Sequence, residues 1–344
     1  GSSFTLLGPT DTQISSTKPV VAVCAVRTGA GKSQTSRRVV EVLMGLGLKV
    51  VAIRHPMPYG NLLAQKVQRF AEIADLERHD CTIEEMEEYE PHIVRGNVIY
   101  SGDDYEAIVR AAESDPDGCD IIVWDGGNND VAFIKPDIQI TVVDPHRPGH
   151  ELGYYPGEVN FRRADVIVIN KMDSAPAEGL ATVRRNIAKV NPKAIVVEAN
   201  SPPVLADPDL VRGKRVLVIE DGPTLTHGEM KIGAGVVASQ RNGAKALVDP
   251  RPYLVGSLVD TFNTYPDIGT LLPAMGYGAD QIKDLEATIN AADCDVVVIG
   301  TPIDLGRILD IDKPHTRVTY DLDEIGSPNL TEVLTRFAKD RGIG

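Results

Sequence analysis

The residues best suited to chemistry lie in the stretch AVRTGAGKSQTSRR, residues 25–38. It contains the Gly-Lys-Ser that ends a phosphate-binding loop, although Val26 stands where the strict pattern has its first glycine. Gly29 and Gly31 let successive backbone N–H groups point into one concavity at a helix start, where the helix dipole also favours anions. Because an apolar strand pattern precedes the stretch and an amphipathic helix pattern follows it, we predict a phosphate site here.

The side chains of this loop have separate predicted roles. Lys32 would reach the outer phosphates of a nucleotide, Ser33 would bind Mg²⁺, and Arg27 would add a second cation near the phosphates. We therefore assign Lys32 and Arg27 as catalytic. The loop is similar to the T-G-x-G-K-[ST] variant of the dethiobiotin-synthetase-like and MinD-like branch of P-loop proteins. The predicted nucleotide-binding residues are Thr28, Gly29, Ala30, Gly31, Lys32, Ser33 and Gln34.

A carboxylate ends a second apolar strand. In DIIVWDGGNND, residues 120–130, Asp125 is followed by Gly126 and Gly127. This is the arrangement of a carboxylate that holds Mg²⁺ beside a closely approaching backbone near the γ-phosphate. Many strands end in Asp-Gly simply because a turn follows. With a phosphate loop upstream, we assign Asp125 as catalytic and as a metal ligand together with Ser33.

Another polar group ends the apolar string VIVINKMD, residues 166–173. It places Asn170, Lys171 and Asp173 in the order N-K-x-D, which resembles the guanine-specificity motif of GTPases. A carboxylate at Asp173 accepts from the N1–H and the exocyclic amine of guanine, a pattern that adenine does not offer. We predict that all three residues bind the nucleotide, GTP or ATP. The alternative is a polar loop that merely follows a strand.

Basic loops follow three further strands, in the strings RHPMPYG, DPHRPGHELGYYPGE and EDGPTLTHGEMKIGAG. Their grouping predicts a site for a second, strongly anionic ligand, because Arg and His side chains recognise carboxylates and phosphates. Taken singly, each histidine is more often a structural hydrogen-bonding residue. The predicted substrate-binding residues are Arg54, His55, His146, Arg147, His150 and His227.

The composition excludes several classes of protein. With 344 residues, 42% of them hydrophobic, the chain is long enough for one large α/β domain or two smaller ones. A net charge of −14 argues against a nucleic-acid partner, because duplex binding needs a basic face. The sequence has neither an apolar run of membrane-spanning length nor a signal-peptide pattern, so we expect no membrane partner and a cytoplasmic location. The four cysteines are too scattered for a zinc site or a disulfide framework.

Short apolar, β-branched runs alternate with helical patterns after residue 19, which is typical of parallel strands covered on both faces. We predict strands at 20–26, 49–55, 120–125, 138–144, 165–170, 194–199, 215–221 and 294–300, and helices at 32–47, 179–191, 279–292 and 327–342. The alternation predicts an α/β fold with a doubly wound, mostly parallel sheet of P-loop NTPase type and a C-terminal α/β extension. We expect a leader at 1–18, a nucleotide-binding domain at 19–212, and a region at 213–344 that either continues the same sheet or forms its own.

Unusual strings carry a family resemblance from about residue 4 to residue 325. They include RHPMPYG, WDGGNND, DPHRPGHELGYYPGE, INKMD, EDGPTLTHGEMKIGAG and IGTPIDLGRIL. With them the chain resembles the cyclic 2,3-diphosphoglycerate synthetases and relatives described as predicted GTPases. The resemblance implies ATP-dependent closure of an intramolecular pyrophosphate in 2,3-diphosphoglycerate. It also implies an additional Rossmann-like N-terminal domain, of which FTLLGP would be the end.

Three functions of different class are compatible with these residues. The first, which we favour, is a Mg²⁺-dependent enzyme that uses GTP or ATP to transfer phosphate to a small anionic, phosphorylated metabolite, and a homodimer is compatible with it. The second is a regulatory or assembly GTPase, which needs only the phosphate loop, Asp125 and the N-K-x-D string. The third is a ligand-binding module with a vestigial nucleotide site, and the intact Lys32, Ser33 and Asp125 count against it.

Overall fold

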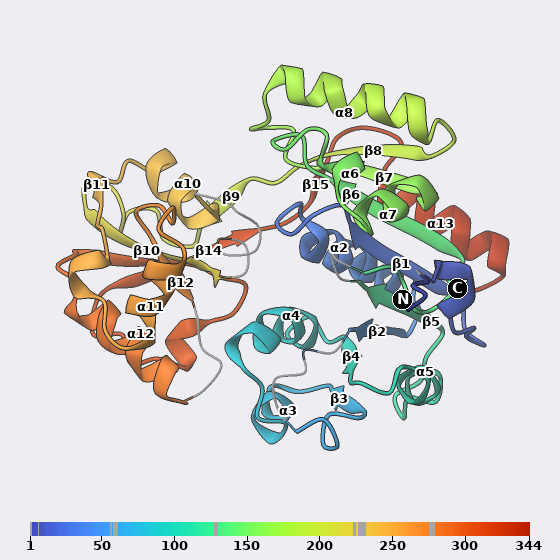
Figure 1. Ribbon diagram of the computed structural model, residues 1–344, viewed down its shortest axis with the longest axis horizontal. Helices are drawn as coiled ribbons and strands as arrows, with labels where there is room; N and C mark the ends of the chain where they lie inside the picture. Colours follow the sequence, from blue (N-terminus) through green and yellow to red (C-terminus); the bar gives the residue numbers. More distant parts are fainter. Residues whose placement is uncertain are drawn as a thin grey trace. The chain divides into compact units, whose positions relative to one another are not determined.

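The computed structural model divides the chain into two compact units (Figure 1). The residues that it describes are 2–5, 7–55, 57, 61–126, 130–222, 225, 232–274 and 279–344. The first unit comprises 1–75, 92–201 and 322–344, and the second comprises 76–91 and 202–321. Each unit contains a sheet of its own.

The first unit is built on a nine-stranded sheet with β1 at its centre. In spatial order the strands are β15 (Asp323–Glu324), β8 (Ile195–Asn200), β7 (Val166–Ile169), β6 (Ile138–Val143), β1 (Val20–Ala25), β5 (Ile121–Asp125), β2 (Val50–Arg54), β4 (Val98–Ser101) and β3 (Gln68–Phe70). All neighbours from β8 to β4 are parallel, whereas the outermost strands β15 and β3 are antiparallel. The predicted α/β fold with a mostly parallel sheet is confirmed.

Helices cover both faces of this sheet. They are α2 (Lys32–Gly45), α5 (Tyr105–Glu113), α7 (Gly157–Arg163), α8 (Ala177–Val190) and α13 (Leu330–Arg341). Val21 and Val23 of β1 pack in a core with α2 and α13, while Val20 and Ala22 pack in a core with α5. Alternate side chains of a strand point to opposite faces, so these helices lie on opposite sides of the sheet. The cluster that contains α7 and α8 packs on the same face as α5, over β6 and β7.

The remaining segments of the first unit are short. They include α1 (Pro9–Thr12) and α6 (His150–Gly153). Ile14 forms a parallel bridge with Ile134, and the Ser16 hydroxyl donates to Glu113 at 3.0 Å, so residues 13–17 lie along the folded unit. Two further helices, α3 (Ile73–Arg78) and α4 (Ile83–Ile93), contribute residues to both units.

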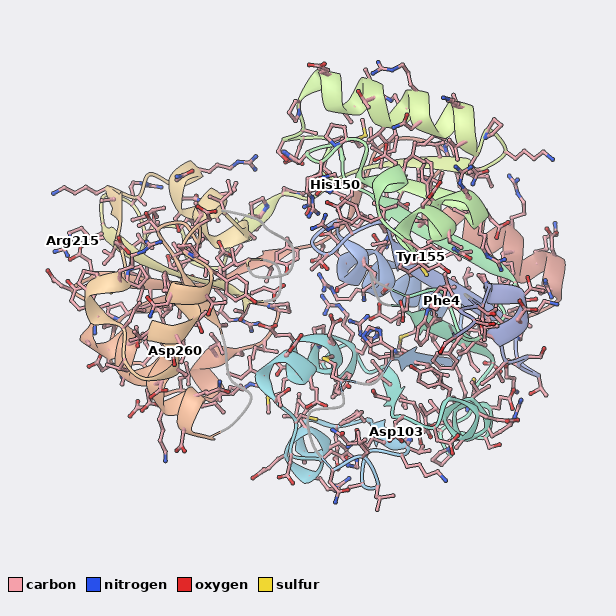
Figure 2. The ribbon with its side chains drawn as sticks, in the orientation of Figure 1. Phe4, Asp103, His150, Tyr155, Arg215 and Asp260 are labelled. Carbon is pink, nitrogen blue, oxygen red and sulfur yellow. The ribbon has the colours of Figure 1, made fainter. Side chains whose placement is uncertain are left out.

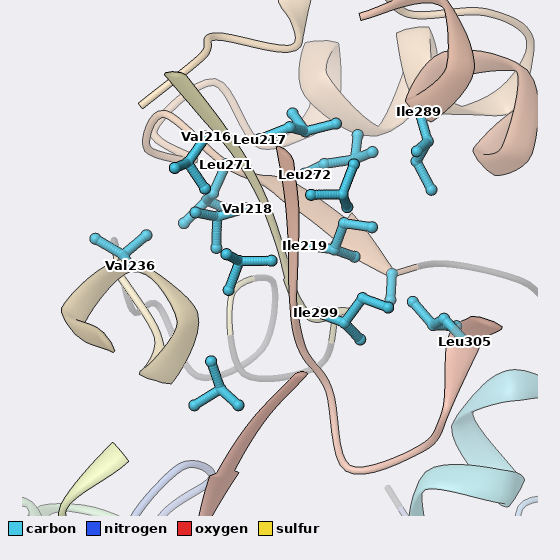
Figure 3. Close-up of a cluster of buried hydrophobic side chains, with 14 of the residues drawn as sticks. Val216, Leu217, Val218, Ile219, Val236, Leu271, Leu272, Ile289, Ile299 and Leu305 are labelled. Carbon is cyan, nitrogen blue, oxygen red and sulfur yellow. The ribbon is translucent and has the colours of Figure 1, made fainter. Parts of the chain in front are cut away.

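The second unit has a six-stranded sheet and a hydrophobic core of its own (Figure 3). Its strands are β11 (Ala246–Leu247), β10 (Arg215–Asp221), β13 (Val296–Gly300), β14 (His315–Tyr320) and β9 (Pro203–Leu205), with β12 (Leu272–Ala274) paired to β10. Residues of α10 (Ala234–Arg241), α11 (Ser257–Thr264) and α12 (Ala279–Ala291) pack in the same core, and 3-10 turns lie at η1 (Arg251–Tyr253) and η2 (Leu305–Arg307). All apolar runs predicted as strands form strands, in both units.

The division of the chain differs from the expected boundary at residue 213. Strand β9, which precedes that boundary, pairs antiparallel with β14 and so belongs to the second sheet. Beyond residue 321 the chain returns to the first unit, where Leu330 and Leu334 of α13 are buried in the core that contains α2. The expected region 213–344 therefore contributes to both units. An amphipathic pattern tells which side chains are buried but not which sheet buries them.

Candidate nucleotide-binding site

The phosphate loop, defined here as residues 26–33, joins the central strand β1 to α2. Strand β1 is flanked by β5, with Val23 in register with Asp125, and by β6, with Ala25 in register with Val142. The carboxyl ends of parallel strands meet at one edge of a sheet. The ends of β5 and β6, at Asp125 and Val143, therefore lie on either side of the end of β1, where the phosphate loop begins.

Gly31 turns the loop into the helix. Its φ of 111° lies in the region that glycine adopts readily and other residues do not. A Cβ at this position would collide with the side-chain amides of Asn170 and Gln34. The Thr35 N–H donates to the Gly31 carbonyl at 3.2 Å and begins the helical hydrogen bonds. The backbone is thus curled at a helix start, as phosphate binding requires.

Asp125, the last residue of β5, is the centre of a buried polar network. Its Oδ1 accepts hydrogen bonds from Lys32 Nζ and Ser36 Oγ, both at 2.6 Å. Burial alone would raise the pKa of this carboxyl group, but the Lys32 ammonium and a hydrogen bond from His92 hold the pKa of Asp125 well below its usual range. Asp125 is therefore ionised at neutral pH, and it ties α2 to the end of β5.

Three further side chains belong to this network. His92 Nε2 lies 3.2 Å from Asp125 Oδ2, and Asn97 Nδ2 lies 3.2 Å from His92 Nδ1. Arg54 Nη1 donates to the backbone carbonyl of Asp125 at 3.0 Å and to that of Gly126. Arg54, which the sequence predicted as a substrate contact, is only 4% exposed and lies against the backbone at the end of β5.

The side chains after β7 hold the phosphate loop through its carbonyl groups. Asn170 Nδ2 donates to the Ala30 carbonyl at 2.9 Å, and Lys171 Nζ donates to the Gly29 carbonyl at 2.5 Å. Lys171 has a φ of 57°, a left-handed conformation that aims its side chain at the loop. Asn170 Oδ1 is buried and has no hydrogen-bond partner in the part of the chain that the structure describes.

Asp173 lies at the exposed end of the same segment. Its Oδ1 accepts from the Ser201 backbone N–H at 3.2 Å, and the Ser201 hydroxyl donates to Gln34 Oε1 at 3.0 Å. The predicted nucleotide-binding residues after β1 and β7 are therefore brought together, with the loop after β8 as a third side.

A second buried carboxylate, Asp144, follows β6 and forms ion pairs with two cations. Asp144 Oδ2 lies 2.9 Å from Arg147 Nη2 and 3.3 Å from Lys171 Nζ. Arg147 Nη2 also donates to the Thr28 carbonyl at 2.7 Å. Burial raises the pKa of Asp144, but Lys171 and Arg147 outweigh it and leave the pKa below its usual value. Arg147 thus contacts the phosphate loop itself.

Arg27 and His150 form a contact beside the same loop. The Arg27 guanidinium carbon lies 3.9 Å from the centre of the Tyr154 ring, and Arg27 Nη1 lies 3.4 Å from His150 Nδ1. Burial and the cations Arg27 and Arg147 lower the pKa of His150, so its imidazole is neutral at neutral pH and its Nδ1 accepts from Arg27. His150 and Tyr155 can be followed in Figure 2.

Of the other predicted residues, His146 and His55 make side-chain contacts outside this network, and Ser33 belongs to the phosphate loop. His146 Nε2 is 3.0 Å from the Ser174 hydroxyl on the exposed side of the loop after β7. His55 Nδ1 is 3.4 Å from Asp130 Oδ2. Ser33 is half-buried at the second position of α2. His227 lies outside the described residues.

Among the residues that the structure describes, no group of three or more His, Cys, Asp or Glu side chains could hold a metal ion. Nor does that part of the chain contain a helix long and apolar enough to cross a membrane.

Four residues of these networks were not predicted, namely Ser36, His92, Asn97 and Asp144. Ser36 is one helical turn beyond Lys32, a spacing that could have identified it. Asp144 ends an apolar strand as Asp125 does, so the same reasoning applied to β6 would have found it. His92 stands in no motif and reaches Asp125 from α4, so no local signal marks it.

No protein-family model matches the sequence. The arginine synthetase ArcE of Thermococcus kodakarensis is 60% identical over 340 residues, which cover 99% of this chain and 75% of that protein. The chain belongs to its family. It is accordingly an enzyme of the synthetase class.

Two solved structures are similar in fold. LpxK from Aquifex aeolicus, crystallised in complex with ATP, is 11% identical with a TM-score of 0.56, and covers 94% of this chain and 90% of its own. At this identity it supports the α/β fold alone. The hydrogenase maturation factor HypB from Archaeoglobus fulgidus is 19% identical over 53% of this chain and 80% of its own, with a TM-score of 0.34. Because ArcE is named as an arginine synthetase, it does not test the resemblance to cyclic 2,3-diphosphoglycerate synthetases, which stays a prediction.

Proposed function

We propose that the chain is a ligase that uses a nucleoside triphosphate and Mg²⁺ to make arginine. The observation that carries the proposal is the 60% identity to an arginine synthetase over almost the whole chain. The site supports it, because Lys32 and the ionised Asp125 meet at the edge of the sheet where α/β proteins bind ligands.

The proposed chemistry follows from the structure of arginine. Its guanidinium carbon bears three nitrogens, so a ligase that adds the last one must replace an oxygen at that carbon. The corresponding substrate is the ureido amino acid citrulline, and the nucleophile is ammonia. The ureido oxygen attacks the γ-phosphorus, and the nucleoside diphosphate leaves with the electrons of the broken P–O bond. Ammonia then adds to the carbon, the C–O bond breaks, and phosphate leaves with the oxygen and one of ammonia's protons.

The chain's own residues would do this by positioning and charge neutralisation. The curled loop at Gly31 offers backbone N–H groups to the phosphates, and Lys32 would reach the γ-phosphate from α2. Ser33 and Asp125 have the oxygen ligands that Mg²⁺ prefers, and the ion would neutralise charge on the transferred group. Ser36 and His92 hold the Asp125 carboxylate in place. Because this carboxylate and the Ser33 hydroxyl are both oxygen donors, the two side chains fit the ion.

The base site would lie at Asp173 and the loop after β8. Asn170 and Lys171 hold the phosphate loop, which leaves base recognition to the exposed Asp173 carboxylate. A carboxylate there favours guanine, so we propose GTP as the better substrate, with ATP as the alternative.

The charges near the loop favour a substrate with little negative charge. Arg54 lies against backbone carbonyls, Arg147 is paired with Asp144, and His150 is neutral at neutral pH. Arg54 and Arg147 are thus engaged with the protein itself, which suits the single carboxylate of an amino acid better than the several charges of 2,3-diphosphoglycerate.

The cyclic 2,3-diphosphoglycerate reaction is the second candidate, supported by the strings that the chain shares with that family. It would begin with the same γ-phosphoryl transfer, but a second phosphate of the substrate would then attack and close the ring. A regulatory GTPase without a small substrate is the remaining alternative, and membership of a synthetase family argues against it.

The deciding experiment measures phosphate release from GTP and from ATP, with and without citrulline and ¹⁵N-labelled ammonium. We expect labelled arginine in step with phosphate, and loss of turnover in Lys32→Ala but not in Lys189→Ala, an exposed residue on α8. A new pyrophosphate signal in ³¹P NMR with 2,3-diphosphoglycerate would favour the second candidate. Slow hydrolysis of GTP that neither substrate accelerates would refute both.

A further inference from the structure

We propose that His92 is a positioning residue that fixes the orientation of the Asp125 carboxylate. The proposal rests on the proposed function, since it concerns the same nucleotide and metal site. His92 is the penultimate residue of α4, and it is far from the phosphate loop in sequence. It nevertheless reaches Asp125 in the first unit, with Nε2 3.2 Å from Oδ2.

The hydrogen bonds around His92 define which ring nitrogen carries the proton. The Asn97 amide donates to Nδ1 at 3.2 Å, so Nδ1 is an acceptor and Nε2 carries the hydrogen. That hydrogen points to Asp125 Oδ2. His92 is 3% exposed and Asn97 is 2% exposed, so both side chains are buried. With both ring nitrogens engaged, His92 acts through Asp125 rather than on the substrate.

The contacts of Asp125 give each carboxylate oxygen a separate task. Oδ1 accepts from Lys32 and Ser36, which belong to α2 directly after the phosphate loop. Oδ2 accepts from His92 on the opposite side. A carboxylate without the His92 contact can rotate about its Cβ–Cγ bond, because that torsion has broad minima. His92 therefore holds Oδ1 toward the phosphate loop, where the ligated ion would lie.

The test compares variants at His92 in the full chain. His92→Leu removes the donor at similar volume, whereas His92→Gln places an amide N–H near the position of Nε2. Loss of a hydrogen bond to a charged group predicts a decrease of about 10- to 100-fold in kcat for His92→Leu. The nucleotide KM at saturating Mg²⁺ should change little, and His92→Gln should recover most of the rate. His315→Leu, at an exposed histidine on β14, is the matched control and should behave as the wild type.

A second readout does not depend on turnover. Mn²⁺ binding, followed by electron paramagnetic resonance with a non-hydrolysable nucleotide, should be about tenfold weaker in His92→Leu. Asn97→Leu should weaken it less, because it leaves His92 in place but removes the partner of Nδ1. Should His92→Leu fail to fold, His92→Ala, which also removes the donor, and Asn97→Leu carry the comparison.

The outcomes separate this inference from the proposed function. Wild-type Mn²⁺ affinity and kcat in His92→Leu, or in Asn97→Leu and His92→Ala together, would overturn the role of His92. A wild-type protein that binds Mn²⁺ and nucleotide but makes no arginine would overturn the proposed function instead, while the Mn²⁺ comparison still decides the role of His92.

Discussion

Replacing Asp144 by asparagine removes one negative charge that two cations share. Asp144 is 2% exposed, and its Oδ2 lies near Arg147 and Lys171. Its Oδ1 accepts from the His146 backbone N–H at 3.0 Å, a bond that asparagine can keep. Arg147 and Lys171 in turn donate to the carbonyls of Thr28 and Gly29, so the substitution also loosens the phosphate loop.

The magnitude follows from the burial of the three groups. Removing one partner of a fully buried ion pair costs about 3–5 kcal/mol. The Arg147 and Lys171 side chains are 15% and 17% exposed, so solvent partly compensates, and we expect a loss of about 2–3 kcal/mol in the free energy of unfolding.

The effect must depend on pH with a definite sign. The folded-state pKa of Asp144 lies below its unfolded value, because Lys171 and Arg147 outweigh the effect of burial. Its stabilisation is therefore complete above the unfolded-state pKa of about 3.9 and disappears as the pH falls through the lower folded-state pKa. The difference between wild type and Asp144→Asn should shrink in that acid range.

Urea unfolding followed by the fluorescence of the single tryptophan provides the assay. Trp124 lies in β5, so it reports on the first unit. The control is Asp165→Asn. Asp165 is an exposed carboxylate that accepts from the Gln139 backbone N–H, so this variant gives the effect on stability of replacing an exposed carboxylate by a neutral amide. A loss for Asp144→Asn within about 0.5 kcal/mol of the control, at neutral pH, would refute the reasoning.

Three further substitutions test other parts of the structure. Gly31→Ala should abolish nucleotide binding, measured by Trp124 fluorescence, whereas Gly47→Ala, which has a positive φ but open space around it, should not. Asp173→Asn should lower the ratio of GTP to ATP turnover, and an unchanged ratio would remove Asp173 from base recognition. Leu334→Ala, fully buried in α13, should reduce the stability of the first unit by about 2–5 kcal/mol in the same urea assay.

The central part of the fold could be predicted because its strands are buried on both faces. Such strands appear as near-continuous apolar runs, as in β1, β5 and β7, and β6 is interrupted only by Gln139 and Thr141. Strands near the edges lack this signal. In β14 (His315–Tyr320) the buried positions alternate with exposed or half-buried ones and include Thr316, so no continuous apolar run marks the strand, and β15 has only two residues. Short, polar edge strands are visible only through their partners.

The site was predictable where chemistry depends on residues next to one another in sequence. Lys32 follows Gly31 in a loop pattern, and the N-K-x-D string brings Asn170 and Lys171 to the same loop. It was not predictable where the contact depends on distant elements. His92 meets Asp125 only because the chain after α4 places β4 beside β2, and nothing local in either segment records that pairing.

The two carboxylates on either side of β1 have complementary tasks. Asp125, after β5, binds Lys32, the cation that must be able to turn to a phosphate. Asp144, after β6, binds Arg147 and Lys171, whose other hydrogen bonds go to loop carbonyls. The C=O and N–H groups of a trans peptide unit point in opposite directions. Because cations hold these carbonyls, the N–H groups of the same peptide units are oriented toward the concavity of the loop. Asp144 therefore supports the backbone that binds phosphate, whereas Asp125 supports the side chain and the ion that neutralise the phosphate. The two carboxylates should therefore affect different steps. Asp144→Asn should weaken the binding of the nucleotide, and loss of the His92 contact to Asp125 should lower the rate of phosphoryl transfer.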